Sequence, residues 1–345
     1  MIRDSADLLT QLRAIHADIR DAVIGACAEK AADDLATPSG DEVGDTIYAI
    51  DRVSETVLVE RFTSLAARWS CVLVAEGIGA DGLMALPSGT TGEEAELRII
   101  VDPIDGTRGI MYQKRSAWIL TGVARNHGSR TTLADIELAL QTEIPLLKQH
   151  LCDSLWLLDG RVGGERLDRL SGKRSRLAPH PSGATTIAHG YGGLARFVPG
   201  GRDVLAAVDD AVVERLLGPV QAGRALAFED QYISTGGQLY ELMMGHDRWI
   251  ADVRPLLEPL LRQRGRELGL ACHSYDLCTE SIARAAGVIV SDERGQRLTA
   301  PLDVITGVSW VGIANAQLRD QLWPALRDAL RDHGLLTEST TSVAR

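Results

Sequence analysis

The sequence predicts a protein of two domains, an α+β N-terminal part followed by a layered α/β C-terminal part. A chain of 345 residues exceeds the usual single domain. Beyond residue 185, helical and strand patterns alternate, which is typical of α/β layers. The polar, glycine-rich and basic stretch 160–185 is expected to be a boundary or a long hairpin loop. We therefore place the domains at 1–180 and 181–336, followed by a disordered tail at 337–345.

The N-terminal part is expected to begin with two helices and to continue as strands. Apolar residues recur at helical spacing over 5–35 and again over 53–62. Short apolar runs bounded by polar or glycine-rich segments are typical of strands. Such runs cover residues 71–75, 97–101, 118–124 and 154–159.

The C-terminal part alternates between the two kinds of pattern. Helices are expected near residues 202–217, 235–246, 255–268, 276–286 and 316–333. Strands are expected at 288–291 and 308–313.

Composition excludes several classes of partner. The net charge of −11 argues against a nucleic-acid polymer, whose binders usually carry a basic face. No apolar stretch approaches the roughly 18 residues that span a bilayer, and the first residues lack the apolar run of a signal peptide. The five cysteines form no C-x-x-C pair, which fits a reducing compartment. We expect a cytoplasmic protein without a membrane partner.

The most informative segment is Val-Asp-Pro-Ile-Asp-Gly-Thr, residues 101–107. Asp102 and Asp105 follow an expected buried strand, and Pro103 and Gly106 favour a rigid, sharp turn. Two ionised carboxylates held close together repel each other unless a proton or a cation lies between them. Oxygen ligands without histidine suit a hard divalent ion such as Mg²⁺. The motif therefore predicts a metal site.

Three further acids stand where they could join this pair. Glu76 ends the preceding strand, so it would point into the same crevice as Asp102. Asp276 stands where a helix begins, and it could cap that helix or reach across a domain cleft. Asp51 lies in an otherwise apolar helix start, where a cap or a salt bridge is the structural alternative.

Other candidate motifs lack the context that their chemistry needs. Gly77-x-Gly79-x-x-Gly82 spells a dinucleotide-binding pattern, but no helical pattern follows it. Gly172-Lys173 lacks the remainder of a phosphate-binding loop. The eight histidines show no zinc spacing. His273 and Cys278 are expected to pack in the core.

The run Asp-Pro-Ile-Asp-Gly-Thr after an apolar strand resembles the signature of the magnesium-dependent, lithium-sensitive phosphomonoesterases typified by inositol monophosphatase. This superfamily also holds fructose-1,6-bisphosphatases and 3′-nucleotide phosphatases. Glu76, about 26 residues before Asp102, matches the family's upstream glutamate, and Tyr275-Asp276 matches its second aspartate motif. Ser234 to Gly237 resembles its turn of small residues, and Thr46 to Asp51 matches loosely. The resemblance implies a layered αβαβα sandwich of the sugar-phosphatase type, with the site between the domains.

The resemblance also implies roles for individual residues. One metal would be held by Glu76, Asp102 and the Ile104 carbonyl. A second would be held by Asp102, Asp105 and Asp276, so that two or three Mg²⁺ ions occupy a site. Substrate would contact Gly106, Thr107, Asp105, Gly236, Gly237 and Asp276, with the backbone N–H groups of Gly106 and Thr107 binding the phosphate. Asp51, Thr107 and Glu76 would be catalytic, with Asp51 and Thr107 orienting the attacking water.

The implied activity is a hydrolase reaction on a small phosphorylated metabolite, by direct attack of metal-activated water. An inositol or sugar phosphate is the first choice of substrate, and a nucleotide, nucleoside phosphate or fructose-1,6-bisphosphate is the alternative. A third possibility is an inactive binding module on the same scaffold. A homodimer is also implied.

Departures from the family pattern fall around the leaving group. Gly77 stands where the family has a second glutamate, and Glu280 stands in place of a glycine. Arg108-Gly109-Ile110 stands after the motif where the family has Thr-Asn-Phe, and Lys114 and Arg115 follow. These changes leave the expected metal ligands in place, and they put the identity of the substrate in question.

Overall fold

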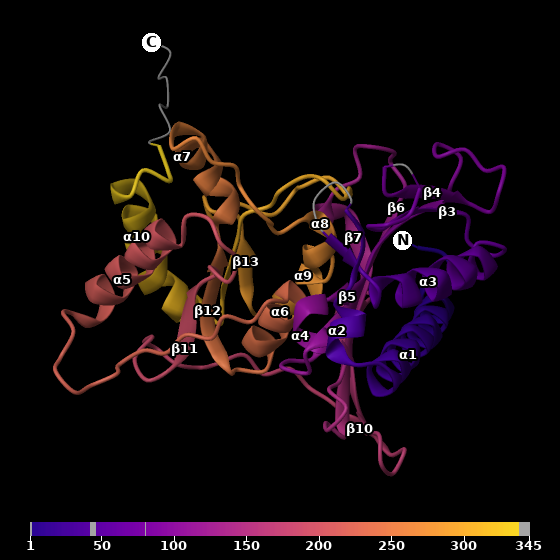
Figure 1. The fold of residues 1–345 in the computed structure, drawn as a ribbon, viewed down its shortest axis with the longest axis horizontal. Coiled ribbons are helices and arrows are strands. Elements are labelled where there is room, and N and C mark those ends of the chain that lie inside the picture. Colours follow the sequence, from indigo (N-terminus) through magenta and orange to yellow (C-terminus); the bar gives the residue numbers. More distant parts are fainter. Residues whose placement is uncertain (1, 42–45, 80, 338–345) are drawn as a thin grey trace.

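Two β-sheets alternate with layers of helices along the long axis of the molecule (Figure 1). The computed structural model describes residues 2–41, 46–79 and 81–337. The tail expected at 337–345 falls, apart from its first residue, outside the described residues.

The larger sheet has eight strands. Their bounds are β3 Cys71–Val74, β4 Leu83–Leu86, β5 Leu97–Asp105, β6 Ala117–Arg125, β7 Ile136–Ile144, β8 Leu151–Leu158, β9 Arg161–Asp168 and β10 Arg174–Arg176. Across the sheet the order is β10-β9-β8-β7-β6-β5-β3-β4. Only β3 and β5 pair in parallel within this sheet, so their carboxyl ends meet at one edge.

The smaller sheet has four strands in the order β11-β12-β14-β13. Their bounds are β11 Tyr191–Leu194, β12 Asp247–Asp252, β13 Ile289–Ser291 and β14 Trp310–Ile313. A separate antiparallel pair, β1 Pro38–Asp41 and β2 Thr46–Tyr48, precedes the third helix.

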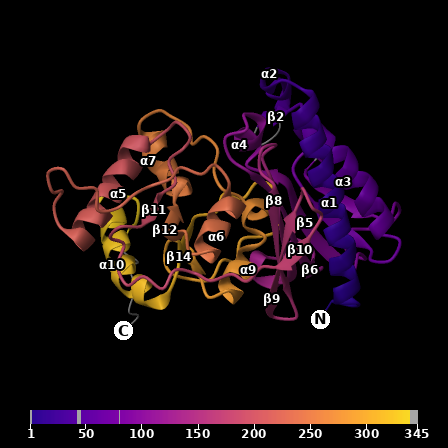
Figure 2. The same cartoon turned by 90° about the horizontal axis from the view of Figure 1, so that it is seen from below.

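Helices form the three remaining layers. Their bounds are α1 Ser5–Glu29, α2 Ala32–Leu35, α3 Asp51–Leu65, α4 Thr107–Met111, α5 Arg202–Leu217, α6 Thr235–Met243, α7 Glu258–Gln263, α8 Ser274–Leu277, α9 Glu280–Ala285 and α10 Ala316–Asp332. Short 3₁₀ turns cover Leu133–Asp135 and Arg254–Leu257. Figures 1 and 2 show α1 and α3 outside the larger sheet, α6, α8 and α9 between the sheets, and α5 and α10 outside the smaller sheet. The predicted αβαβα sandwich is therefore confirmed.

The polar stretch 160–185 contains a hairpin of two strands, with less irregular loop than its composition suggested. Residues Arg161–Asp168 and Arg174–Arg176 add β9 and β10 to the larger sheet, and the chain then passes to the smaller sheet. A Cβ at Gly163 would lie 2.2 Å from Nε1 of Trp156 on β8, so glycine is required for this strand to pair. Glycine in this segment therefore marks close strand packing rather than a flexible linker.

Two of the expected C-terminal helices are shorter than predicted. The amphipathic run 255–268 forms a 3₁₀ turn and then α7, which ends at Gln263 just before Gly265 at a φ of 66°. The run 276–286 is divided into α8 and α9. Strands β4, β7, β11 and β12 were not predicted. The structure adds them between the expected elements.

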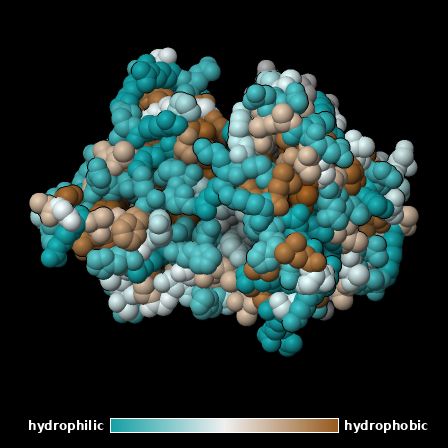
Figure 3. Space-filling model, turned by 60° about the horizontal axis from the view of Figure 1, so that its bottom comes forward, coloured by the Kyte–Doolittle hydropathy of each residue, from teal (hydrophilic) through white to brown (hydrophobic). Residues whose placement is uncertain are grey.

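The length and the hydrophobicity of a helix decide whether it can cross a lipid bilayer. Within the described part of the chain, no helix combines the length and the hydrophobicity that would cross a bilayer. The face drawn in Figure 3 is mainly hydrophilic, with hydrophobic side chains in small, separate groups.

Candidate active site and metal centre

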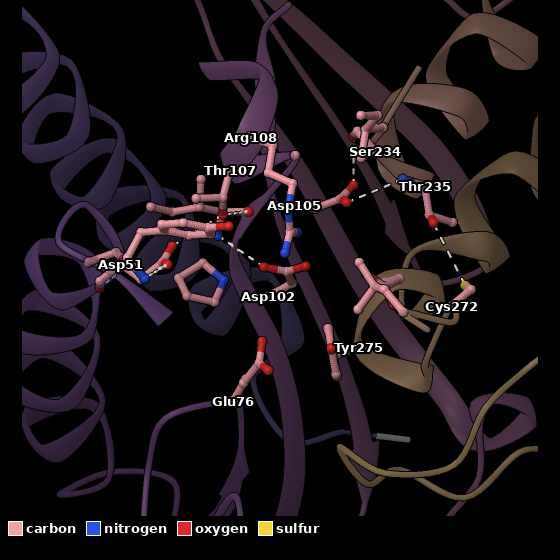
Figure 4. A pocket seen from close by; sticks show the side chains of 18 of the residues that line it. Asp51, Glu76, Asp102, Asp105, Thr107, Arg108, Ser234, Thr235, Cys272 and Tyr275 are labelled. Atoms are coloured by element: carbon pink, nitrogen blue, oxygen red, sulfur yellow. Dashed lines mark hydrogen bonds between the residues drawn. The ribbon is translucent and has the colours of Figure 1, made fainter. Parts of the chain in front are cut away.

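Three carboxylates converge where the two sheets face each other. Asp102 and Asp105 come from the end of β5, and Asp276 comes from α8. One oxygen from each lies within 4.8 Å of the other two, a spacing that can hold a metal ion. Figure 4 shows Glu76 and Asp102 turned toward the same space, with Asp51 on one side and Ser234 on the other.

The position of Glu76 follows from the parallel pairing of β3 and β5. Val74 pairs with Ile100, and continuing that register by two residues brings Glu76 alongside Asp102. The spacing of about 26 residues in the sequence is therefore the register of the two strands. Glu76 and Asp102 line one pocket, as predicted, and repulsion from Glu76 is one cause of the raised pKa of Asp102.

The backbone turns sharply between the two aspartates and α4. The Ile104 N–H donates to Asp102 Oδ1 at 3.0 Å, which fixes that carboxylate. Gly106 adopts a φ of 97°, and a Cβ there would lie 3.1 Å from Cβ of Ser234. Thr107 then begins α4. The motif needs glycine at position 106 because of both its backbone conformation and the proximity of Ser234.

Asp105 is held by the start of α6. Its Oδ2 accepts hydrogen bonds from Ser234 Oγ at 2.8 Å and from the Gly236 N–H at 2.6 Å. Its Oδ1 accepts one from the Thr235 N–H at 3.2 Å. A carboxylate has about four lone-pair sites, so Asp105 keeps one for a metal ion.

Gly236 and Gly237, which were expected to contact the substrate, lie outside the pocket wall. Both glycines are buried. The Gly236 N–H is bound to Asp105, and the Gly237 N–H donates to Ser234 Oγ at 2.9 Å. A Cβ at Gly236 would lie 2.9 Å from Asp105 Oδ2. Gly236 therefore positions the Asp105 carboxylate directly, and Gly237 does so through the Ser234 hydroxyl.

Asp276 both caps α8 and belongs to the carboxylate cluster. Its Oδ2 accepts a hydrogen bond from the His273 N–H at 2.6 Å, which caps α8. Its carboxylate also reaches Asp102 and Asp105. His273 packs against Tyr275, with ring centroids 5.3 Å apart, and the Cys278 thiol is buried and free, as expected for core residues.

Burial and mutual repulsion raise the pKa values of the carboxyl groups in this cluster. Burial, followed by repulsion from Asp105, raises the pKa of Asp102 well above its usual value. Burial and then Asp105 likewise raise the pKa of Asp276. Burial raises the pKa of Asp105 to about 6, although three hydrogen bonds oppose the shift. A divalent cation would compete with protons for these carboxyl groups, and the all-oxygen donor set fits Mg²⁺.

Asp51 and Thr107 are brought together as predicted. Thr107 Oγ1 lies 3.1 Å from Asp51 Oδ1 and 2.8 Å from the Ile104 carbonyl oxygen, and its single proton serves one acceptor at a time. Asp51 Oδ2 accepts the Tyr48 N–H at 2.8 Å, so Asp51 also closes the turn before α3. The Ile104 carbonyl retains a second lone pair for the predicted metal contact.

No protein-family model and no curated protein matches this chain. Solved structures match it over nearly its whole length. Fructose-1,6-bisphosphatase of Leishmania major is 14% identical with a TM-score of 0.62, covering 93% of each chain. A hypothetical Pyrococcus horikoshii protein, described as similar to inositol-1 monophosphatase, is 14% identical with a TM-score of 0.60, covering 93% of this chain and 99% of that one. A Thermotoga maritima inositol monophosphatase is 14% identical with a TM-score of 0.57, covering 94% and 100%.

The chain has the inositol monophosphatase and fructose-1,6-bisphosphatase fold. Its predicted resemblance is thereby confirmed at the level of architecture. At this identity, the roles of single residues rest on the geometry of the chain itself.

Within this inositol monophosphatase-type fold, the pocket wall also contains residues that the motifs did not indicate. Arg254 is buried, and its Nε donates to Asp252 Oδ1 at 2.9 Å while its Nη1 donates to the Leu270 carbonyl at 2.7 Å. The guanidinium lies 4.4 Å from the ring centroid of Phe197. An arginine two residues after an aspartate at a strand end is a weak signal, so Arg254 was not predicted.

The basic residues that follow the motif make different contacts. Arg108 lines the pocket, and its guanidinium lies 5.5 Å from the ring centroid of Tyr48. Arg115 instead forms an ion pair with Asp230 and covers the ring of Tyr232 at 4.4 Å. Among the three basic residues at 108, 114 and 115, only Arg108 is in the pocket wall.

Removing the charge of Asp102 is expected to stabilise the metal-free protein at neutral pH. The raised pKa values mean that the folded state binds protons that the unfolded state releases. For Asp105, this stability is complete below the unfolded pKa near 3.8 and is lost as the pH rises through the folded pKa of about 6, and for Asp102 and Asp276 it is lost as the pH rises through their own raised pKa values. In EDTA at pH 7.5, Asp102→Asn should therefore melt a few degrees above wild type, since about 1 kcal/mol moves the melting temperature of a large domain by roughly 2–4 °C.

Thermal melts of both proteins at pH 5 and pH 7.5, each in EDTA, check this expectation. The difference should shrink at pH 5, where wild type keeps its protons. A wild type that melts above the variant at pH 7.5 would show that the carboxylates do not repel each other.

Proposed function

We propose that the chain is a Mg²⁺-dependent hydrolase of a small phosphate monoester. The observation that carries this proposal is the convergence of Asp102, Asp105 and Asp276 within 4.8 Å, next to the hydrogen-bonded pair of Thr107 and Asp51. An acidic cluster alone would repel a phosphate dianion. With two or three divalent ions bound, the same cluster attracts it.

The residues around the cluster divide the work of binding and activation. Gly106 and Thr107 line the pocket, and the turn they form can offer backbone N–H groups to the phosphate. Mg²⁺ bound at the carboxylates would lower the pKa of a water molecule and neutralise charge on the transferring phosphoryl group. When Thr107 donates its proton to Asp51, its oxygen can accept a hydrogen bond from that water. Asp51 then holds Thr107 in the orientation that water activation requires.

Direct attack by water agrees with the state of the nearby thiols. Burial raises the pKa of both Cys272 and Cys278 well above the usual thiol value. Both therefore remain protonated at neutral pH and are poor nucleophiles. The proposed reaction accordingly uses water, and neither thiol, as the nucleophile.

An inositol or sugar phosphate remains the first candidate substrate. The pocket wall gives specific support to the alternative, a nucleotide, nucleoside phosphate or fructose-1,6-bisphosphate. Arg108 and Arg254 line it together with three aromatic residues, Tyr48, Phe197 and Tyr275. Guanidinium groups favour a leaving group with further negative charge, and aromatic rings favour a planar one.

Phosphate release from a panel of phosphorylated metabolites tests the proposal. The panel contains inositol 1-phosphate, sugar phosphates, nucleoside monophosphates and fructose-1,6-bisphosphate, each assayed with Mg²⁺. We expect turnover of at least one compound. No turnover of any compound, together with no Mg²⁺-dependent rise in melting temperature, would instead support an inactive binding module. Homodimer formation and a cytoplasmic location stay predictions.

Arg108→Gln should weaken binding of substrates whose leaving group is anionic. The guanidinium reaches the pocket, and losing a charge-assisted contact of about 1.5–3 kcal/mol corresponds to roughly a tenfold to hundredfold rise in KM. KM for a substrate with a neutral leaving group should change less. Arg115→Gln is the matched control, because Arg115 is paired with Asp230. Equal KM changes in both variants would contradict a substrate contact.

A further inference from the structure

Glu55 lies in the wall of the active-site pocket without an assigned role. It stands one helical turn after Asp51 on α3, and both side chains line the pocket. Its Oε2 accepts a hydrogen bond from Arg52 Nη1 at 2.9 Å. Its side chain is 15% exposed, against 47% for Arg52. The carboxylate is therefore held at the inner side of the helix.

The other carboxylate oxygen of Glu55 fills the space next to Gly77. Gly77 follows Glu76 directly and has a φ of 81°. A Cβ at position 77 would lie 2.5 Å from Glu55 Oε1 and 3.1 Å from Glu55 Cδ. The Glu55 carboxylate therefore occupies the place next to the Gly77 backbone where a side chain at position 77 would begin.

This placement bears on one of the departures from the family pattern. The motifs of this chain resemble a family in which a second glutamate follows the one matched by Glu76, and here that position is Gly77. In the structure, the Glu55 carboxylate, which comes from α3, lies next to the backbone of Gly77, the residue that follows Glu76.

We propose that Glu55 is a metal-site residue whose carboxylate adds negative charge and an oxygen ligand on the Glu76 side of the cluster. The inference rests on the proposed function, because it requires a divalent ion at the carboxylates. Oxygen from a carboxylate is the donor that Mg²⁺ prefers, and Oε1 is the oxygen nearest to position 77. Arg52 positions the side chain through Oε2.

The opposing interpretation is that Glu55 serves only the ion pair with Arg52. Exposed pairs three residues apart on a helix contribute little to stability. That role would leave metal affinity unchanged, so a metal titration separates the two interpretations without any substrate.

The experiment titrates EDTA-treated, dialysed protein with Mn²⁺ and measures free Mn²⁺ by electron paramagnetic resonance. Glu55→Gln should weaken Mn²⁺ binding by roughly 10–100-fold, the range seen when groups around a metal site are replaced. Glu60→Gln is the matched control, because Glu60 is exposed on the same helix and does not line the pocket. A Glu55→Gln protein that binds Mn²⁺ like the control overturns the inference.

Asp102→Asn serves as the reference for the cluster itself. If this variant loses Mn²⁺ binding while Glu55→Gln retains it fully, the inference fails and the proposed metal centre stands. If neither substitution changes Mn²⁺ binding, the proposed function fails as well.

Discussion

Asp102→Asn is expected to lower kcat by about a thousandfold or more while the protein stays folded. Asp102 is the carboxylate that faces Asp105, Asp276 and Glu76 at once, and all three repel it in the absence of a cation. Metal ions contribute several kcal/mol of transition-state charge stabilisation, and about 1.4 kcal/mol corresponds to a factor of ten in rate. Steady-state phosphate release in saturating Mg²⁺ gives the value of kcat.

The control for this prediction is a measurement that shows the Asp102→Asn protein to be folded. The amide side chain that Asp102→Asn introduces retains an oxygen that can accept the Ile104 N–H. Circular dichroism and the melting temperature in EDTA should therefore show an intact protein. Activity within tenfold of wild type would contradict the assignment of Asp102 as a ligand shared between metal ions.

Thr107→Ala is expected to lower kcat by roughly 10²–10⁴, the usual range for a group that positions a proton transfer. The hydroxyl is the bridge between Asp51 and the Ile104 carbonyl, so its loss removes the proposed hydrogen bond to the attacking water. Thr107→Ser keeps the hydroxyl and should retain far more activity. The comparison of kcat for the two variants is the measurement.

The pattern of effects on the two kinetic constants separates activation from binding. If Thr107→Ala raised KM with kcat unchanged, Thr107 would contact the phosphate only in the ground state. Metal affinity, measured by Mn²⁺ titration, should stay near the wild-type value, since Thr107 is not among the proposed ligands.

The sequence predicts the centre of the site well because that centre is built from local geometry. A strand end, a proline and a glycine place Asp102 and Asp105, and the register between β3 and β5 places Glu76 alongside. Asp276 was predicted because Tyr275-Asp276 matches the second aspartate motif of the family that the chain resembles. The hydrogen bonds that hold Asp105 come from residues distant in the sequence, and the motifs did not indicate them.

The remainder of the site depends on packing between distant segments. Glu55 has an apparent role only once α3 lies beside the loop after β3, and no motif signals that contact. Gly236 and Gly237 were assigned to the substrate because sequence does not show that their N–H groups are occupied by Asp105 and Ser234. The contact between the Arg254 guanidinium and the ring of Phe197 joins two segments that are distant in the sequence, so no motif indicates it.

The same reasoning explains the errors in the fold. Strand β9 has a polar composition because its residues are partly exposed, and its glycines reflect the close approach of Trp156. Composition alone could not separate that case from a linker. The layered architecture was nevertheless predicted, because the buried strands and amphipathic helices that form the core keep their own periodicities.

Titration of the metal-free protein with Mg²⁺, with phosphate release as the readout, tests the central claim most directly. Protein treated with EDTA and dialysed should release no phosphate from its best substrate, and activity should rise with added Mg²⁺ to a plateau. Excess EDTA should abolish that activity again. Full turnover in EDTA, or no turnover at any Mg²⁺ concentration, would contradict a metal-dependent phosphatase at the carboxylate cluster.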